Sequence, residues 1–168
     1  MGLSGRGTDC ERFCPGIAAK LTMATVNQLA EELSKEFHEL PESARLELLL
    51  EFSENLPPLP KRYEDHPELL ERVEECQSPV YLFIEINEQD RVQVFLTAPK
   101  EAPTTRGFAS ILHSVLDNQP SADVLKLDDD FPSTIGLTQL VSPLRINGMR
   151  GMMRRIKRQV REKLSEIE

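Results

Sequence analysis

Two short runs of strand-forming residues lie near the middle of the chain, with a polar turn between them. Val80–Ile86 is rich in β-branched and aromatic side chains, Asn87–Asp90 has the composition of a turn, and Arg91–Thr97 alternates in part between polar and apolar residues. Two such runs joined by four polar residues predict an antiparallel hairpin. We therefore expect a sheet built around this hairpin, with helices packed against it.

Apolar residues at helical spacing occur on both sides of the hairpin. Thr25 can cap a first helix, a second helix is predicted from about Pro41, and the prolines of segment 57–60 end it. The segment Leu69–Glu75 suits either a short strand or a helical turn. The predicted core face of the second helix consists of Leu46, Leu49, Leu50 and Phe52 or Ser53. Later helices are predicted from Thr104 or Thr105 to about Asp117, from Pro120 to Leu125, from Ile135 to Val141, and from Arg145 or Asn147 to the C-terminus.

The order of the elements is helices, a small sheet and then helices again, without strand–helix–strand alternation. This order predicts an α+β fold with a small antiparallel sheet of about three strands and helices packed on one face. At 168 residues the chain is long enough for one domain with its own core. Residues 1–24 hold several glycines and no sustained apolar period, so we expect a disordered extension, and Met23 could equally be the true start. Residues 25–168 are predicted to form the single domain.

The charge of the chain is unevenly distributed. The formal net charge of −8 argues against a general nucleic-acid binder, because neutralising phosphates is the main source of such affinity. Segment 27–75 holds 5 basic and 14 acidic residues, whereas segment 145–163 holds 8 basic and 1 acidic. Two solvated helix faces that partly neutralise each other would explain this asymmetry, and so would a protein docking surface.

The three cysteines are too few and too unevenly placed for a disulfide framework, and no Cys/His spacing of a structural zinc site occurs. We therefore expect a reduced, cytoplasmic protein without a metal or other cofactor. No apolar run reaches the length that crosses a bilayer, so no membrane association is expected. Asp128–Asp130 lacks the spacing of a calcium loop and is interpreted as turn and capping residues. His113 is interpreted as a surface or boundary residue of its helix.

Cys76 is the only cysteine in the part of the chain predicted to fold, because Cys10 and Cys14 lie in the glycine-rich start. A lone cysteine beside an apolar run is most often a small buried hydrophobic residue. A position just before a strand also suits a functional thiol, because a rigid neighbour holds it while a partner can reach it. The local sequence leaves both interpretations open.

Three motifs occur in a fixed order along the chain. They are Cys76-Gln77-Ser78 before an apolar strand, Arg106-Gly107-Phe108 at the start of a helix, and Leu137-Thr138-Gln139 followed by Ser142-Pro143-Leu144-Arg145-Ile146-Asn147-Gly148. They resemble the corresponding segments of the SufE family, the sulfur-acceptor partners of cysteine desulfurases in iron–sulfur cluster assembly. The resemblance spans about Val26 to Arg161, which is essentially the whole predicted domain.

The resemblance implies that Cys76 accepts a persulfide, with Gln77, Ser78 and Arg145 as supporting or partner-binding residues. It also implies a cysteine desulfurase, which is a PLP enzyme, as the partner that the protein stimulates, and an iron–sulfur scaffold complex as the recipient. The protein itself would be a sulfur carrier and not an enzyme, and a homodimer is an open possibility. The alternative is a non-covalent adaptor of the assembly machinery in which Cys76 is structural.

Two further classes fit the sequence poorly. A cluster scaffold needs several thiolate ligands, and the folded region offers one cysteine. A thiol hydrolase needs a histidine and a third residue placed around the cysteine, and no motif places them there.

The residues before the cysteine predict a weakly reactive thiol. Glu74 and Glu75, if near, raise the pKa of Cys76, and an apolar cavity does the same. We therefore expect a thiol that is sheltered in the free protein. Docking would then activate it, when the loop swings out and partner charges or Arg145 lower its pKa.

Overall fold

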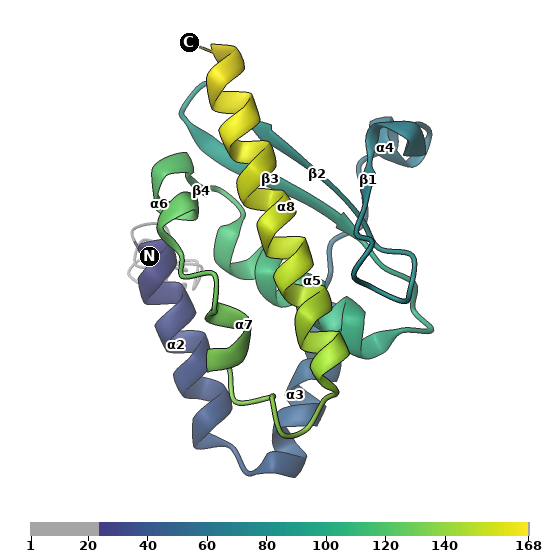
Figure 1. Cartoon of the computed structure of the whole chain (residues 1–168), viewed down its shortest axis with the longest axis vertical. Coiled ribbons are helices and arrows are strands. Elements are labelled where there is room, and N and C mark those ends of the chain that lie inside the picture. The colour runs from purple at the N-terminus through teal and green to yellow at the C-terminus, as the bar shows by residue number, and fades with distance from the viewer. Residues whose placement is uncertain (1–23, 168) are drawn as a thin grey trace, which may run out of the picture.

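The computed structural model describes residues 24–167. Residues 1–23 of the predicted N-terminal extension therefore lie outside the described part. Its elements, in chain order (Figure 1), are α2 (Val26–Glu39), α3 (Glu42–Glu54), α4 (Lys61–Glu64), η1 (Pro67–Leu69), β1 (Glu71–Arg72), β2 (Tyr81–Ile86), β3 (Arg91–Thr97), α5 (Pro103–Leu116), β4 (Gln119–Pro120), α6 (Ser121–Lys126), α7 (Phe131–Thr134) and α8 (Pro143–Ile167). Thr25 caps α2 as predicted, because its side chain accepts from the amide of Gln28 while the Gln28 side chain accepts from the amide of Thr25.

The predicted hairpin is confirmed and forms the centre of an antiparallel sheet with strand order β1-β2-β3-β4. β2 pairs with β3 along its whole length, with Ile84 opposite Val94. The side chain of Asn87 closes the loop, since its Oδ1 accepts from the amide of Arg91 at 2.9 Å. The α+β class is confirmed, and the sheet has four strands because the two-residue strands β1 and β4 add to its edges.

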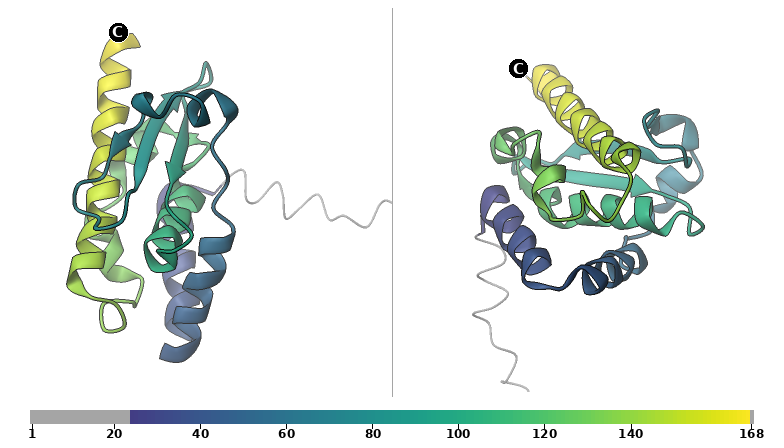
Figure 2. Two further views of the ribbon diagram at one scale, coloured as in Figure 1. Left: turned by 90° about the vertical axis from the view of Figure 1, so that its right-hand side faces the viewer. Right: turned by 60° about the horizontal axis from the view of Figure 1, so that its bottom comes forward.

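The two faces of the sheet differ in what covers them. The buried side chains of β2 and β3 point toward the long helices α5 and α8, and they are Leu82, Ile84, Val92, Val94 and Leu96. On the other face, the Tyr63 ring of α4 lies against Phe83 and Phe95, with ring centroids 5.2 and 4.9 Å apart. α2 and α3 pack on α5, on the side away from α8 (Figure 2).

The predicted core face of α3 is correct at Leu49 and Ser53 and wrong at Leu46 and Leu50. Leu49 and Ser53 are buried, but Leu46 and Leu50 are 37% and 44% exposed. A Cβ at Gly107 would lie 2.5 Å from the Leu49 carbonyl oxygen, so the two helices approach closely along one strip. The side of α3 that carries Leu49 and Ser53 meets α5, and Leu46 and Leu50 lie outside this contact.

One predicted helix is absent, and two predicted helix starts are displaced. Segment 135–141 forms turns and no helix, since Gly136 takes φ +88° and the amides of Leu140 and Val141 both donate to the Leu137 carbonyl. α5 begins at Pro103, before either threonine, and α8 begins at Pro143. Proline suits the first turn of a helix because the amide it lacks would have no partner there.

Candidate functional site

Cys76 lies in the loop between β1 and β2. The amide of Val73 donates to the carbonyl of Val80 at 2.9 Å and closes the base of this loop, and the amide of Cys76 donates to the carbonyl of Val73 at 3.1 Å. We call residues 73–80 the cysteine loop. Cys76 is the only cysteine among residues 24–167, and it is 7% exposed.

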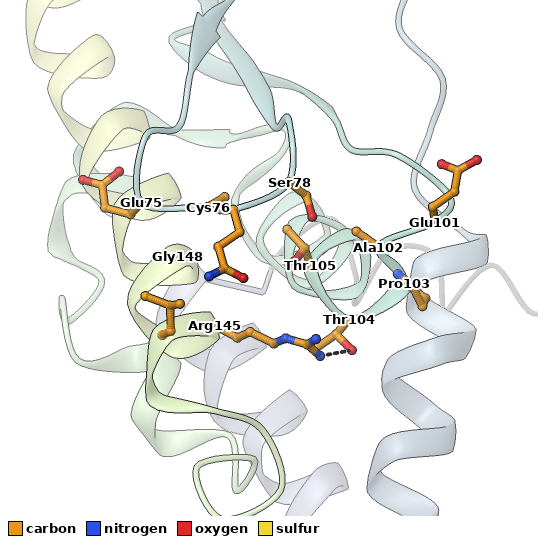
Figure 3. Close-up of a pocket in the computed structure, with 12 residues that line it drawn as sticks. Glu75, Cys76, Ser78, Glu101, Ala102, Pro103, Thr104, Thr105, Arg145 and Gly148 are labelled. Carbon is orange, nitrogen blue, oxygen red and sulfur yellow. Dashed lines mark hydrogen bonds between the residues drawn. The ribbon is translucent and has the colours of Figure 1, made fainter.

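Two glycines of α8 let the cysteine loop lie directly on the helix. A Cβ at Gly148 would lie 3.0 Å from Sγ of Cys76, and a Cβ at Gly151 would lie 2.7 Å from the carboxylate of Glu75. Residues three apart share one face of a helix, so both glycines face the loop. Figure 3 shows Gly148 beside Cys76. The thiol is therefore packed against the backbone of α8.

Arg155 lies one turn further along this face of α8 and joins the helix to the cysteine loop and to β1, the strand before it. Its Nη1 forms an ion pair with Glu75, and its Nε lies 3.3 Å from Oε1 of Glu71 in β1. The Arg155 side chain is only 16% exposed. Gln159 continues this connection, since its Nε2 donates to Glu71 and its Oε1 accepts from the amide of Ile84. These contacts fasten the loop to α8.

The surroundings of Cys76 hold its thiol in the protonated form. Burial raises the pKa of Cys76 to about 11, and the negative charge of Glu75 acts in the same direction. The positive charge of Arg155 opposes both effects. Glu75 therefore acts as the sequence predicted, whereas Glu74 is exposed and does not contribute.

A pocket of about 250 Å³ opens beside the cysteine loop, between the first turns of α5 and α8. All four site residues named from the sequence line it, and they are Cys76, Gln77, Ser78 and Arg145. The guanidinium of Arg145 donates to Oγ1 of Thr104 at 3.1 Å, so it spans the pocket from α8 to α5 (Figure 3). Arg145 makes no contribution to the pKa of the thiol in this state.

The other charged clusters hold the fold together. Asp129 pairs with Lys157 and Asp130 pairs with Arg150, so two of the three adjacent aspartates bind α8. Oδ1 of Asp128 accepts from the amide of Asp130, as in the turn that the sequence predicted. Within residues 24–167, no three His, Cys, Asp or Glu side chains are grouped closely enough to hold a metal ion.

The sequence alone did not identify Arg155, Gly151 or Thr104 as parts of this site. The available signal was spacing, because Gly148, Gly151 and Arg155 recur on one face of the last helix. That signal has no meaning until the loop on this face is known.

Known proteins resemble this chain over most of its length. The family model named SufE, described as an Fe-S metabolism associated domain, matches residues 31–160. The chain belongs to the SufE family. This membership gives the protein a role in iron–sulfur metabolism.

Several known proteins share the sequence or the fold of this chain. An uncharacterised SufE-like protein of Mycobacterium tuberculosis is 48% identical over 131 residues, which cover 78% of this chain and 90% of that protein. The cysteine desulfuration protein SufE of Plasmodium falciparum is 30% identical over 84 residues, 49% of this chain and 34% of that protein. A hypothetical protein of Thermus thermophilus, solved in solution, has 31% identity and a TM-score of 0.72 over 82% of this chain and 96% of that one.

The described helices of this SufE-family protein differ in length or apolar character from a membrane span. Across residues 24–167, none combines the length and the apolar character that spanning a bilayer requires.

The raised pKa predicts an unusual pH dependence of thiol alkylation. In a Cys10→Ser, Cys14→Ser variant, Cys76 is the only thiol, and its alkylation by iodoacetamide should rise about tenfold per pH unit from pH 7 to about pH 10. The reason is that only the thiolate reacts and that a pKa of about 11 keeps its fraction small throughout this range. When the same variant is unfolded in urea, its alkylation rate should level off at about pH 9, because an exposed cysteine has a pKa of about 8.5. If the alkylation rate of the folded protein reached a plateau below about pH 10, Cys76 would not have the raised pKa that its burial implies.

Neutralising Glu75 should make the free thiol more reactive. Glu75→Gln removes a charge that raises the pKa of Cys76 and also breaks the ion pair with Arg155. Alkylation at pH 7.5 should become about three to ten times faster, since one pKa unit changes the thiolate fraction about tenfold. Glu74→Gln is the matched control, because Glu74 is exposed and does not affect the thiol. Equal rates for the two variants would show that Glu75 does not restrain Cys76.

Proposed function

We propose that this protein accepts sulfur as a persulfide on Cys76 from a cysteine desulfurase and passes it to an iron–sulfur cluster scaffold. The observation that carries the proposal is that the only described cysteine lies at a pocket lined by all of the residues that the family resemblance singled out. The name of the Plasmodium falciparum relative, cysteine desulfuration protein, supports the same chemistry.

The transfer step is an exchange between sulfur atoms. The thiolate of Cys76 attacks the outer sulfur of the persulfide on the desulfurase, a new S–S bond forms on Cys76, and the donor cysteine leaves as a thiolate. No electrons are gained or lost overall. The recipient takes the sulfur by the same exchange, so the protein needs no cofactor of its own for either step.

A sheltered thiol suits a carrier. A persulfide that reacts with any small thiol loses its sulfur, so the carrier should react only when its partner is present. In the free protein, Cys76 is buried and protonated, and Arg155 fastens its loop to α8. Docking would lift the loop from Gly148, free the thiol from its apolar surroundings and bring it near Arg145 or cationic groups of the partner, all of which lower its pKa.

An adaptor without sulfur chemistry is the second candidate. Burial of Cys76 against Gly148 is what a purely structural cysteine would also show. In that case the protein would stimulate the desulfurase or the scaffold by binding alone.

Replacing the sulfur of Cys76 by oxygen distinguishes the two candidates. Cys76→Ser should bind the desulfurase about as well as the unchanged protein, because the side chain differs by one atom, yet it should abolish the stimulation of cysteine turnover. Alanine release measures the turnover, and isothermal titration calorimetry measures the binding. Cys10→Ser, Cys14→Ser is the control and should stimulate fully. Full stimulation by Cys76→Ser would instead establish the adaptor.

A further inference from the structure

α3 exposes apolar side chains that its packing does not explain. Leu46 and Leu50 lie one turn apart on the same side of α3 and are 37% and 44% exposed. Across the pocket beside Cys76, Leu144 at the start of α8 is 48% exposed. A contiguous patch of exposed apolar side chains often marks a site of protein–protein contact, whereas isolated exposed leucines are common.

These leucines are connected through Pro103. Pro103 and Leu144 both line the pocket beside Cys76. Pro103 and Leu50 both line a neighbouring groove of about 510 Å³ between α3 and the start of α5. Figure 3 shows Pro103 on the side of the pocket that faces α3. Apolar surface therefore runs from the mouth of the pocket onto α3, and we call Leu46, Leu50, Pro103 and Leu144 the apolar ridge.

Acidic side chains border the apolar ridge. Glu47, Glu51 and Glu54 are exposed on the adjoining face of α3, and Glu101 is exposed at the rim of the pocket. Among residues 24–167, none of these four carboxylates forms an ion pair, in contrast to Glu71 and Glu75, which bind α8. Two exposed cations line the same pockets, Lys100 beside Leu50 and Pro103 and Arg145 beside Leu144. Four carboxylates against these two cations leave the ridge with apolar contact at its centre and a net negative charge at its edge.

We propose that the apolar ridge is part of the docking surface for the cysteine desulfurase, which covers it with an apolar patch bordered by arginine or lysine side chains. This inference rests on the proposed function. A donor enzyme that delivers a persulfide to Cys76 must cover the mouth of the pocket, and the ridge begins at that mouth. Apolar contact at the centre supplies affinity, while the carboxylates speed association and select for a basic partner.

The test introduces charge where the apolar contact would form. Leu46→Glu, Leu50→Glu should weaken binding to the desulfurase of the source organism by about tenfold or more, because two carboxylates would face an apolar patch. The KM for the carrier should rise while kcat at saturation stays unchanged, since Cys76 is untouched. Leu46→Ser, Leu50→Ser should give a smaller loss in the same direction. Leu69→Glu in η1 is the matched control, because Leu69 is 50% exposed and lies outside the ridge.

The outcomes separate this inference from the proposed function. Calorimetry of binding requires no sulfur transfer, so the affinity of the ridge variant tests the docking surface whether or not Cys76 carries sulfur. Unchanged affinity in Leu46→Glu, Leu50→Glu would overturn the inference and leave the carrier function intact. Sedimentation of the unchanged protein and of the Leu46→Glu, Leu50→Glu variant measures whether either of them forms a dimer. If the variant only abolishes a homodimer and binds the desulfurase normally, the ridge is a self-association surface and the inference is wrong.

Discussion

The contact between the cysteine loop and α8 determines the chemical state of Cys76. Gly148 and Gly151 leave room for the loop, and Arg155 fastens it from the same face of the helix. α8 packs in turn against β2 and α5, so the position of the thiol is fixed by the core of the protein. Burial at this contact, reinforced by Glu75, raises the pKa of the thiol and keeps it protonated.

The basic residues of α8 and the acidic residues of α3 differ in whether they form ion pairs within the fold. Much of the basic charge of α8 is used inside the molecule, where Arg150, Arg155 and Lys157 bind nearby acidic side chains. The glutamates of α3 have no such partners among residues 24–167 and face outward beside exposed leucines. Arg155 therefore fastens the cysteine loop, Arg150 and Lys157 fasten the segment with Asp129 and Asp130, and the glutamates of α3 are exposed to solvent.

Local patterns predicted the hairpin, the α+β class and most helices, because strand alternation and helical spacing depend on neighbours in the chain. The motifs also indicated Cys76, Gln77, Ser78 and Arg145, which the fold brings to one pocket. Arg155 could not be found in this way, since its importance comes from Glu71 and Glu75, far away in sequence. The exposure of Leu46 and Leu50 could not be predicted either, because it depends on which side of α3 meets α5. Residues 135–141 were misassigned because their apolar spacing suits a helix, whereas Gly136 turns the chain.

Mass spectrometry of the peptide that contains Cys76, after incubation with an active cysteine desulfurase and cysteine, tests most directly whether this protein carries sulfur. A persulfide on Cys76 should add about 32 Da to this peptide, and a reductant should remove the increment. The same preparation must release alanine, which shows that the desulfurase turned over. Turnover without any mass increase on the Cys76 peptide would contradict a sulfur carrier.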